Sequence, residues 1–234
     1  LLLEGCFEAS ESALAGQLRL DLVIQGAEQG EAFLAAGLDI PLNVWLKLDS
    51  GMHRLGFDPA ALRAWHARLR SHPGVRELNL ISHFACADER NHPLTEQQLE
   101  SFLGLLDLDF DQRSLANSAA VLTIPAAHMD WLRPGIMLYG STPLADLSAA
   151  ELGLKPAMSL GAQLISLREV AVGESVGYGA TWIAERPARI GTVSCGYADG
   201  YPRTAPAGTP VLVGGRRAIL AGRVSMDMLT VDLS

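Results

Sequence analysis

Hydrophobic positions follow two patterns along the chain. In roughly the first two thirds, short apolar runs typical of strands alternate with segments in which apolar residues recur at helical spacing. This alternation predicts parallel strands with helices outside them, as in a doubly wound sheet or a (β/α) barrel. The expected strands lie, in order, within LLLEG, LRLDLVIQ, LNVWLKLD, ELNLISHF, RSLANS and WLRPGIMLYG.

Two helices have start signals. Asp58 and Pro59 supply a cap and a first-turn proline, and Thr95 with Gln98 fits a capping box. The apolar residues that follow at helical spacing are Leu62, Trp65 and Leu69 in the first helix and Leu99, Phe102, Leu103 and Leu106 in the second.

From about Leu154 the pattern becomes alternating and punctuated by glycine, as in AQLISLREV and VLVGGRRAIL. Gly214 and Gly215 between two apolar runs indicate a hairpin. We therefore expect an α/β fold with two domains: a partial (β/α)8 barrel over residues 1–148 and an incomplete antiparallel β domain over 149–234. The first part has about six strand-like runs against the eight of a closed barrel, so the barrel would lack its first strands.

Composition narrows the class of protein. Hydrophobic residues make up 49% and charged residues 19% of the 234 residues, which excludes a disordered chain. The net charge of −8 and the lack of a Lys/Arg run argue against nucleic-acid binding. No apolar run approaches the roughly 18 residues that span a bilayer.

The cysteines and the chain ends add two expectations. Cys6, Cys86 and Cys195 are odd in number and widely spaced, which fits a reducing cytoplasm better than a disulfide or zinc framework. The start, LLLEG, and the end, MLTVDLS, both have strand character. We expect both ends to be cut from a longer protein.

Polar residues gather where the expected strands end, and the ends of barrel strands carry active sites. In VWLKLDSGMHRLGF, Lys47 and Asp49 share one strand face before the chain turns towards Arg54. The alternative is an internal Lys–Asp pair that supports the turn.

His83 follows the next strand directly. His83, Asp88 and His92 could form a metal set, but their spacing matches no helix-borne ligand motif. We predict no metal and an orienting role for His83.

The next two strand ends suggest an anion site. Asn117 and Ser118 precede a helix start, whose free N–H groups suit a phosphate, although a plain N-cap is the alternative. Arg133 in an apolar run must either pair with an acid or face a ligand. Gly135 allows a close backbone approach.

In the second part, the candidate residues are Tyr197, Asp199, Met226 and Asp227. Turn chemistry explains the Asp-Gly pair at 199–200. Tyr178 lies between Gly177 and Gly179, and local pattern alone favours a turn residue there.

Taken together and in this order, these stretches resemble the alanine racemase family, pyridoxal-phosphate enzymes that interconvert L- and D-alanine, and most closely its catabolic bacterial branch. The resemblance covers essentially the whole chain. The stretches that carry it are LKLDSGMHRLGF, ISHFACAD, LANSAAVL, RPGIMLYG, VGYGATW, GYADGYPR and GRVSMDML.

The resemblance implies a (β/α) barrel followed by a β domain, and a homodimer whose active site is shared between subunits. Tyr178, Tyr197 and Met226 would then act on the partner's cofactor, pyridoxal 5′-phosphate. It also implies two acid/base groups, with Tyr178 on one face of Cα and a Schiff-base lysine on the other. A free phenol has a pKa near 10, so nearby positive charge must favour its ionised form. His83 would link Tyr178 to Arg133, which faces the pyridine nitrogen.

The remaining roles are also implied by the resemblance. Asn117 and Ser118, with the backbone of Gly135 and Ile136, would hold the phosphate. Arg54 would contact the phenolic oxygen and the substrate carboxylate. The residues expected on the substrate side are Met226, through its backbone, Tyr197 and Asp227. Lys47 matches a position that is carbamylated in family members.

The sequence departs from the family where the Schiff-base lysine is expected, in a segment resembling K-A-D-A-Y-G-H-G. The chain's lysines are Lys47 and Lys155, and neither lies in such a segment. The chain is therefore either part of a working racemase or a truncation that cannot racemise. A broad-specificity racemase or a decarboxylase of related fold is a third alternative, and Arg133 argues against the decarboxylase.

Overall fold

In the computed structural model, we describe residues 1–234, except for the side chain of Ala9. The chain divides into two compact units, Leu1–Met158 and Ser159–Ser234. The predicted border between residues 148 and 149 lies earlier in the chain and stays a prediction. We describe each unit by itself.

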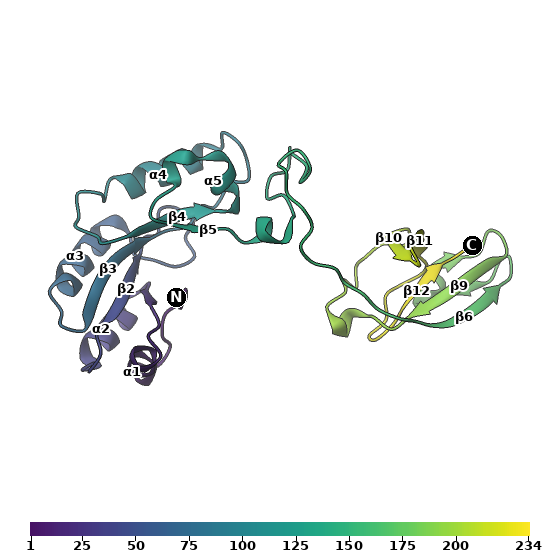
Figure 1. The fold of residues 1–234 in the computed structure, drawn as a ribbon, viewed down its shortest axis with the longest axis horizontal. Coiled ribbons are helices and arrows are strands. Elements are labelled where there is room, and N and C mark those ends of the chain that lie inside the picture. Colours follow the sequence, from purple (N-terminus) through teal and green to yellow (C-terminus); the bar gives the residue numbers. More distant parts are fainter. The chain divides into compact units, whose positions relative to one another are not determined.

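Unit 1 alternates strands and helices (Figure 1). Its strands are β1 (Leu22–Ile24), β2 (Leu42–Lys47), β3 (Val75–Ile81), β4 (Arg113–Asn117) and β5 (Trp131–Arg133). Its α-helices are α1 (Ala9–Gln17), α2 (Ala27–Ala35), α3 (Pro59–Arg70), α4 (Pro93–Leu103) and α5 (Ser118–Thr123). Two short 3-10 helices complete it: η1 (Pro125–Ala127) and η2 (Ile136–Tyr139).

The strands of unit 1 form one parallel sheet in the order β1-β2-β3-β4-β5. Of the runs expected to be strands, LLLEG makes only an isolated bridge, between Leu2 and Leu22. The segment after β5 coils into η2, because Pro134 and Gly135 interrupt the extended run. β5 is therefore a strand of only three residues at the edge of the sheet.

Alternation along β2 separates two faces of this sheet. Leu42, Val44 and Leu46 pack in the large core with apolar residues of the helices. The residues between them point to the other face, where Trp45 packs in a separate small cluster and Lys47 ends the strand. The same alternation that builds the core thus leaves a polar residue at the carboxyl end of the opposite face.

The predicted start of α3 is confirmed. Asp58 is the N-cap and accepts a 2.8 Å hydrogen bond from the Ala61 N–H, and Pro59 occupies the first turn. The predicted apolar stripe is buried: Leu62, Trp65 and Leu69.

The predicted capping box of α4 is wrong. Pro93 starts the helix before Thr95, and the ring of His92 accepts the capping hydrogen bond from the Leu94 N–H at 3.2 Å. Gln98 is therefore inside the helix and fully buried. Its carboxamide bonds to two loops at the carboxyl ends of the strands.

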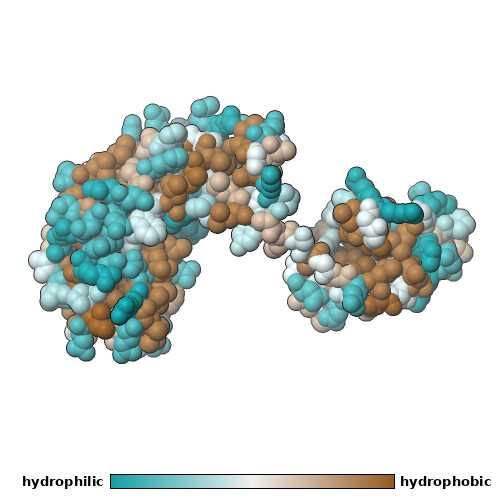
Figure 2. All heavy atoms as spheres, viewed as in Figure 1, coloured by the Kyte–Doolittle hydropathy of each residue, from teal (hydrophilic) through white to brown (hydrophobic). Residues whose placement is uncertain are grey.

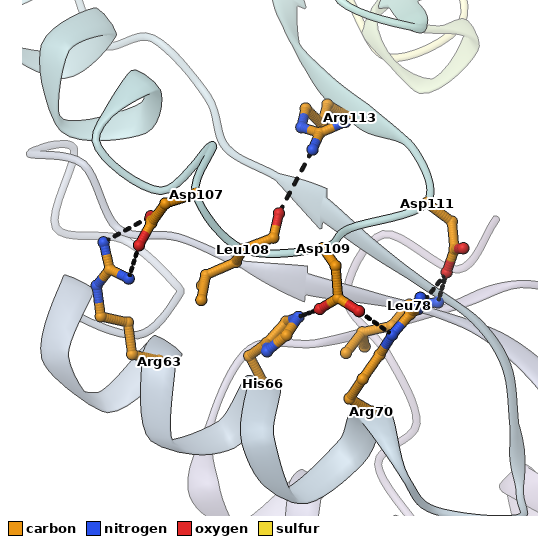
Figure 3. A network of polar contacts seen from close by, with 9 residues as sticks. All are labelled: Arg63, His66, Arg70, Leu78, Asp107, Leu108, Asp109, Asp111 and Arg113. Carbon is orange, nitrogen blue, oxygen red and sulfur yellow. Dashed lines mark hydrogen bonds and ion pairs between the residues drawn. The ribbon is translucent and has the colours of Figure 1, made fainter.

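A polar network ties α3 to the segment before β4 (Figure 3). The α3 residues are Arg63, His66 and Arg70, and their partners are Asp107, Asp109 and Asp111. Arg70 donates to Asp109 at 2.9 Å and to Asp111 at 2.6 Å, and Asp111 also accepts the Leu78 N–H at 2.8 Å. In Figure 2, hydrophilic side chains gather over this helix-covered side.

Unit 2 is a β domain. Its strands are β6 (Leu164–Val170), β7 (Ser175–Val176), β8 (Trp182–Ile183), β9 (Ala188–Val193), β10 (Pro210–Val213), β11 (Arg216–Leu220) and β12 (Leu229–Asp232). Its 3-10 helices are η3 (Tyr178–Ala180) and η4 (Tyr197–Asp199). One antiparallel sheet has the order β10-β11-β12-β9-β6, and β7 pairs with β8.

The predicted hairpin at Gly214 and Gly215 is confirmed, since the two glycines join β10 to β11 with φ angles of 57° and 79°. The parallel α/β unit followed by an antiparallel β unit confirms the predicted fold class. None of the helices within the described residues has the length and apolar character required to cross a membrane.

We predict that Asp111→Asn lowers the free energy of unfolding by about 1 kcal/mol at pH 7, because a charged partner of Arg70 is lost. Burial raises the pKa of Asp111, but the bonds from Arg70 and the Leu78 N–H lower it more, so the net direction is down. This contribution is present above the ordinary pKa of about 3.9 and is lost as pH falls through the folded-state pKa.

Urea denaturation at several pH values measures the effect. Wild type and variant should converge in stability as the pH falls through the lowered folded-state pKa of Asp111. The matched control, Asp107→Asn, changes a more exposed pair with Arg63 and should change stability little. A constant difference between wild type and Asp111→Asn at all pH values would contradict the linkage.

Candidate active site

Four cationic or basic residues lie at or just after the carboxyl ends of strands in unit 1. We call them the cationic cluster: Lys47 at the end of β2, Arg54 in the following loop, His83 after β3 and Arg133 at the end of β5. The strand register places Lys47 opposite Ile81 and Arg133 opposite Asn117. Because the strands are parallel, their carboxyl ends lie along one edge of the sheet, and the polar residues predicted at these ends lie there.

Arg133 is the most buried cation of the cluster. Its guanidinium donates to the Ser114 hydroxyl and to the Ser82 carbonyl, and it lies 3.4 Å from the Leu115 carbonyl oxygen. Its Nη2 is 3.3 Å from Nδ1 of His83. Burial lowers the pKa of Arg133 to about 10. At neutral pH the guanidinium therefore remains charged.

The sequence left two alternatives for Arg133, an acidic partner or a ligand. Among the ion pairs of the described side chains, none includes Arg133, Lys47 or Arg54. Neutral oxygens accept from Arg133 instead. Half-buried positive charge without a carboxylate is the property expected of a site that binds an anion.

His83 is held neutral by its surroundings. Burial is the largest cause that lowers its pKa, to about 4, and the charges of Arg133, Lys47 and Arg54 act in the same direction. A neutral imidazole has one donor and one acceptor nitrogen. Since Nδ1 faces the Arg133 guanidinium, it is the acceptor and Nε2 carries the proton.

Lys47 and Asp49 do not form the ion pair that the turn alternative requires. Asp49 instead accepts from the N–H groups of Gly51 and His53 at 3.0 and 2.9 Å, and pairs with Nδ1 of His53 at 3.0 Å. It therefore folds the loop that carries Arg54. Burial lowers the pKa of Lys47, Arg133 and Arg54 lower it further, and Asp49 acts in the opposite direction.

The expected phosphate cradle has two distinct parts. Asn117 is the N-cap of α5 and accepts from the Ala120 N–H at 3.1 Å. Buried Ser118 accepts from the Gly135 N–H at 2.7 Å, which brings the two predicted segments together. A Cβ on Gly135 would meet only the Ser118 hydroxyl, at 3.9 Å, and Ile136 is 50% exposed.

His92 and Asp88 show no metal-site arrangement. The His92 ring serves as the cap of α4. Within the part of the chain that the structure describes, no group of three or more His, Cys, Asp or Glu residues is placed to hold a metal ion.

In unit 2, Tyr178, Tyr197 and Met226 line one cavity of about 870 Å³. We call it the tyrosine pocket. Tyr178 is 71% exposed, and the φ angles of Gly177 and Gly179 are 79° and 75°, values that favour glycine. The flanking glycines therefore have a conformational role as well as leaving space.

Main-chain contacts fix the wall of this pocket. The Tyr197 N–H donates to Ser225 at 3.1 Å, and the Ala198 N–H donates to the Met226 carbonyl at 2.9 Å. A Cβ at Gly196 would lie 2.2 Å from the Met226 carbonyl oxygen, so only glycine fits there. Asp227 is exposed beside Met226 and is not among the lining residues. Asp199 caps η4 by accepting from the Gly196 N–H, in accord with a turn role.

Sequence reasoning missed five residues around these two sites. Arg203 and Arg223 line the tyrosine pocket, and the Arg203 guanidinium lies over the Tyr197 ring at 5.2 Å. Ser82, Ser114 and Gln98 bond to members or strand ends of the cationic cluster. For Gln98 the sequence did contain a signal, because a glutamine next to Leu99 in the apolar stripe of a helix is expected to be buried and to need hydrogen-bond partners.

We predict that the His83 imidazole titrates at about pH 4 and that Arg133→Met and Arg54→Met each raise its pKa, Arg133→Met by more. Neither variant restores the ordinary value near 6.5, because burial remains. The folded state binds fewer protons than the unfolded one between these values, so stability falls as pH is lowered through this window. NMR titration of the imidazole measures the pKa, and an unchanged value in both variants would refute the electrostatic contribution.

Known proteins resemble the chain over its whole length. It is 99% identical over 234 residues to a Pseudomonas aeruginosa protein named "Alanine racemase, biosynthetic", and 68% identical to an alanine racemase of Stutzerimonas stutzeri. In both cases all of this chain is covered, but it spans 65% of the relative's length.

Solved structures agree with these matches. The crystal structure of the biosynthetic alanine racemase of Pseudomonas aeruginosa matches all of this chain with a TM-score of 0.94, at 99% identity and 65% coverage of that chain. The alanine racemase of Acinetobacter baumannii matches 99% of this chain with a TM-score of 0.86, at 39% identity and 65% coverage of that chain.

The expected resemblance to the catabolic branch is wrong, since the 99% identical relative is named biosynthetic. The stretches that carried the resemblance surround the cationic cluster and the tyrosine pocket. Residues that serve one shared reaction do not distinguish branches that use it in different metabolic roles.

Family comparisons cover both units. Residues 1–143 match "Alanine racemase, N-terminal domain", and residues 157–234 match "Alanine racemase, C-terminal domain". Together with the geometry of the two sites, these matches show that the chain belongs to the alanine racemase family.

Proposed function

We propose that the protein interconverts L- and D-alanine with pyridoxal 5′-phosphate, by proton transfer at Cα. The observation that carries the proposal is the cationic cluster, in which Arg133 is half-buried and bonded to neutral oxygens, with no acidic partner among the described side chains. Family membership supplies the reaction class. The chain spans 65% of its relatives, so the activity of the whole protein is part of the proposal.

The residues present fit this cofactor, which carries a phosphate and a phenolic oxygen. The start of α5 at Ser118, with the backbone of Gly135 and Ile136, would hold the phosphate, and Asn117 keeps that helix start in place. Arg54 would contact the phenolic oxygen. When bound, the cofactor supplies an electron sink for the charge that remains once the Cα proton has left.

Arg133 would face the pyridine nitrogen and determine which chemistry follows. With a pKa of about 10, Arg133 keeps its protons at neutral pH. It is a weaker acid than a carboxylic acid and would therefore leave the ring nitrogen unprotonated. A weaker electron sink favours return of a proton to Cα over transamination. Neutral His83 accepts a hydrogen bond from Arg133 at Nδ1, and its Nε2–H can donate a hydrogen bond to a further group.

Tyr178 would serve as the acid/base group on one face of Cα. Its exposed phenol lines a pocket that also contains Tyr197, Arg203, Arg223 and Met226. The two guanidinium groups favour an anionic substrate. We propose that Arg54, the Met226 backbone, Tyr197 and Asp227 form the substrate side, although Asp227 is outside the pocket lining. The resemblance assigns the opposite face to a lysine that neither Lys47 nor Lys155 matches.

Lys47 is proposed to carry a carbamate. The lowered pKa increases the fraction of neutral amine, which is the form that reacts with carbon dioxide. The modified side chain would be an anion beside Arg54 and Arg133 and could orient Arg54. Asp49 does not compete for this role, because it is bonded to Gly51 and His53.

We further propose, from the family resemblance, a homodimer in which the tyrosine pocket of one subunit serves the cationic cluster of the other. A cationic cluster without a tyrosine base would bind cofactor without racemising. A tyrosine pocket without the cluster would lack the cofactor. Each copy would thus contribute one part to each of two sites.

In a protein of the relatives' full length, Tyr178→Phe should reduce racemisation in both directions by at least about 100-fold, because one acid/base group is lost. The visible absorbance of bound cofactor should persist. Racemisation assays that start from L-alanine and from D-alanine measure the activity, and absorption spectroscopy measures the bound cofactor. Loss of cofactor binding, or nearly unchanged activity, would contradict the assigned role.

Subunit mixing tests the shared site. Tyr178→Phe and Arg133→Met homodimers should each be inactive, whereas co-refolded mixtures should regain about a quarter of wild-type activity, because half the dimers contain one intact site. Mixing Tyr178→Phe with Tyr178→Phe subunits is the matched control. If each site is built within one chain, the mixture stays inactive.

A further inference from the structure

The side chain of Gln98 uses its full hydrogen-bond donor capacity at the carboxyl ends of the strands. Its Nε2 donates to the His83 carbonyl and to the Ser50 hydroxyl, each at 3.1 Å, and its Oε1 accepts from the Ala85 N–H at 2.9 Å. A carboxamide has two donors, and both are occupied. The side chain is fully buried, so water cannot replace these partners.

From Gln98, hydrogen bonds continue through the hydroxyl groups of Ser50 and Ser82, and each group donates to the next. Ser82 donates its single hydroxyl proton to the Leu48 carbonyl at 2.9 Å. Its contact with Ser50, also at 2.9 Å, must therefore use the Ser50 proton. The chain of donors runs from Gln98 to Ser50, to Ser82 and to Leu48. Bonds arranged in this way strengthen one another.

This chain connects two loops of the candidate active site. Ser50 belongs to the loop between β2 and α3, which carries Arg54 and packs on α4 through Gly51; a Cβ there would lie 3.2 Å from Leu94. His83 is the second residue of the loop after β3. Gln98 is thus a bridge from α4 to both loops.

Gln98 and Arg133 also hold neighbouring carbonyls from two different elements. Arg133 donates to the Ser82 carbonyl, and Gln98 donates to the His83 carbonyl. Two consecutive peptide groups are therefore fixed at the position where the His83 side chain leaves the main chain. The 3.3 Å contact between His83 and Arg133 depends on this placement.

We propose that Gln98 is a positioning residue for the racemisation reaction, which holds His83 against Arg133 and couples their placement to the Arg54 loop. This inference rests on the proposed function. Gln98 touches neither of the proposed reacting groups, Tyr178 and Cα of the substrate, and acts through His83 and Ser50.

The test uses Gln98→Met in the full-length protein, because methionine has a similar length and no hydrogen-bonding amide. We expect kcat for alanine to fall about 10-fold or more, since small displacements of catalytic groups have effects of this size, with little change in KM. Ser50→Ala, which leaves the His83 bond in place, should have a smaller effect.

The matched control is Gln112→Met. Gln112 also uses its carboxamide, donating to Glu77 and accepting from Trp131, but it lies before β4, at the amino end of the strands. It should lower thermal stability without lowering kcat. Equal loss of kcat in Gln98→Met and Gln112→Met would show that Gln98 has only a structural role.

A measurement independent of activity is the NMR titration of His83. In Gln98→Met its pKa should rise above about 4, because release of the main chain separates the imidazole from Arg133 and admits water. In Gln112→Met it should not change. If wild type fails to racemise alanine, the proposed function is wrong; if wild type is active but Gln98→Met retains its kcat and its His83 pKa, the positioning role is wrong.

Discussion

The structure of unit 1 depends on how one half-buried guanidinium, that of Arg133, satisfies its donors. Arg133 lies at the end of a three-residue strand of the parallel sheet, and its acceptors are a hydroxyl of β4, the Leu115 carbonyl and the Ser82 carbonyl beyond β3. A buried charge requires such partners, or its burial is strongly unfavourable. The guanidinium at the end of β5 therefore links β4 to the segment that follows β3. These bonds bring His83 next to Arg133, whose main chain lies opposite Asn117 in the sheet.

In the proposed function, the chemistry is divided between the two units. The cationic cluster can bind anions and keep an imidazole neutral, but among its four members it has no phenol or carboxylate that could exchange a proton with Cα. Tyr178 is in the other unit, in a loop shaped by Gly177 and Gly179. Under that proposal, electrostatic binding and proton transfer would be tasks of two separately folded parts.

Local signals in the sequence predicted the structure correctly where a residue interacts with residues close to it in the chain. Asp58 and Pro59 started α3 as predicted, and Gly214 with Gly215 turned the hairpin, since both depend on contacts within a few residues. Thr95 and Gln98 matched a local pattern, but Pro93 started the helix earlier and Gln98 found partners far away in sequence. The acceptors of Arg133 come from two segments far from it in sequence, β4 and the stretch after β3, and no local pattern could reveal them.

The edge position of β5 has a consequence for motion. The strand has three residues, its register with β4 is interrupted between Ser114 and Asn117, and Trp131 and Leu132 are largely exposed. Short, singly paired strands open by local fluctuation more readily than central ones. Within this chain, each opening would draw Arg133 away from the Ser82 carbonyl and from His83, so the placement of the guanidinium depends on a strand that is paired on one side.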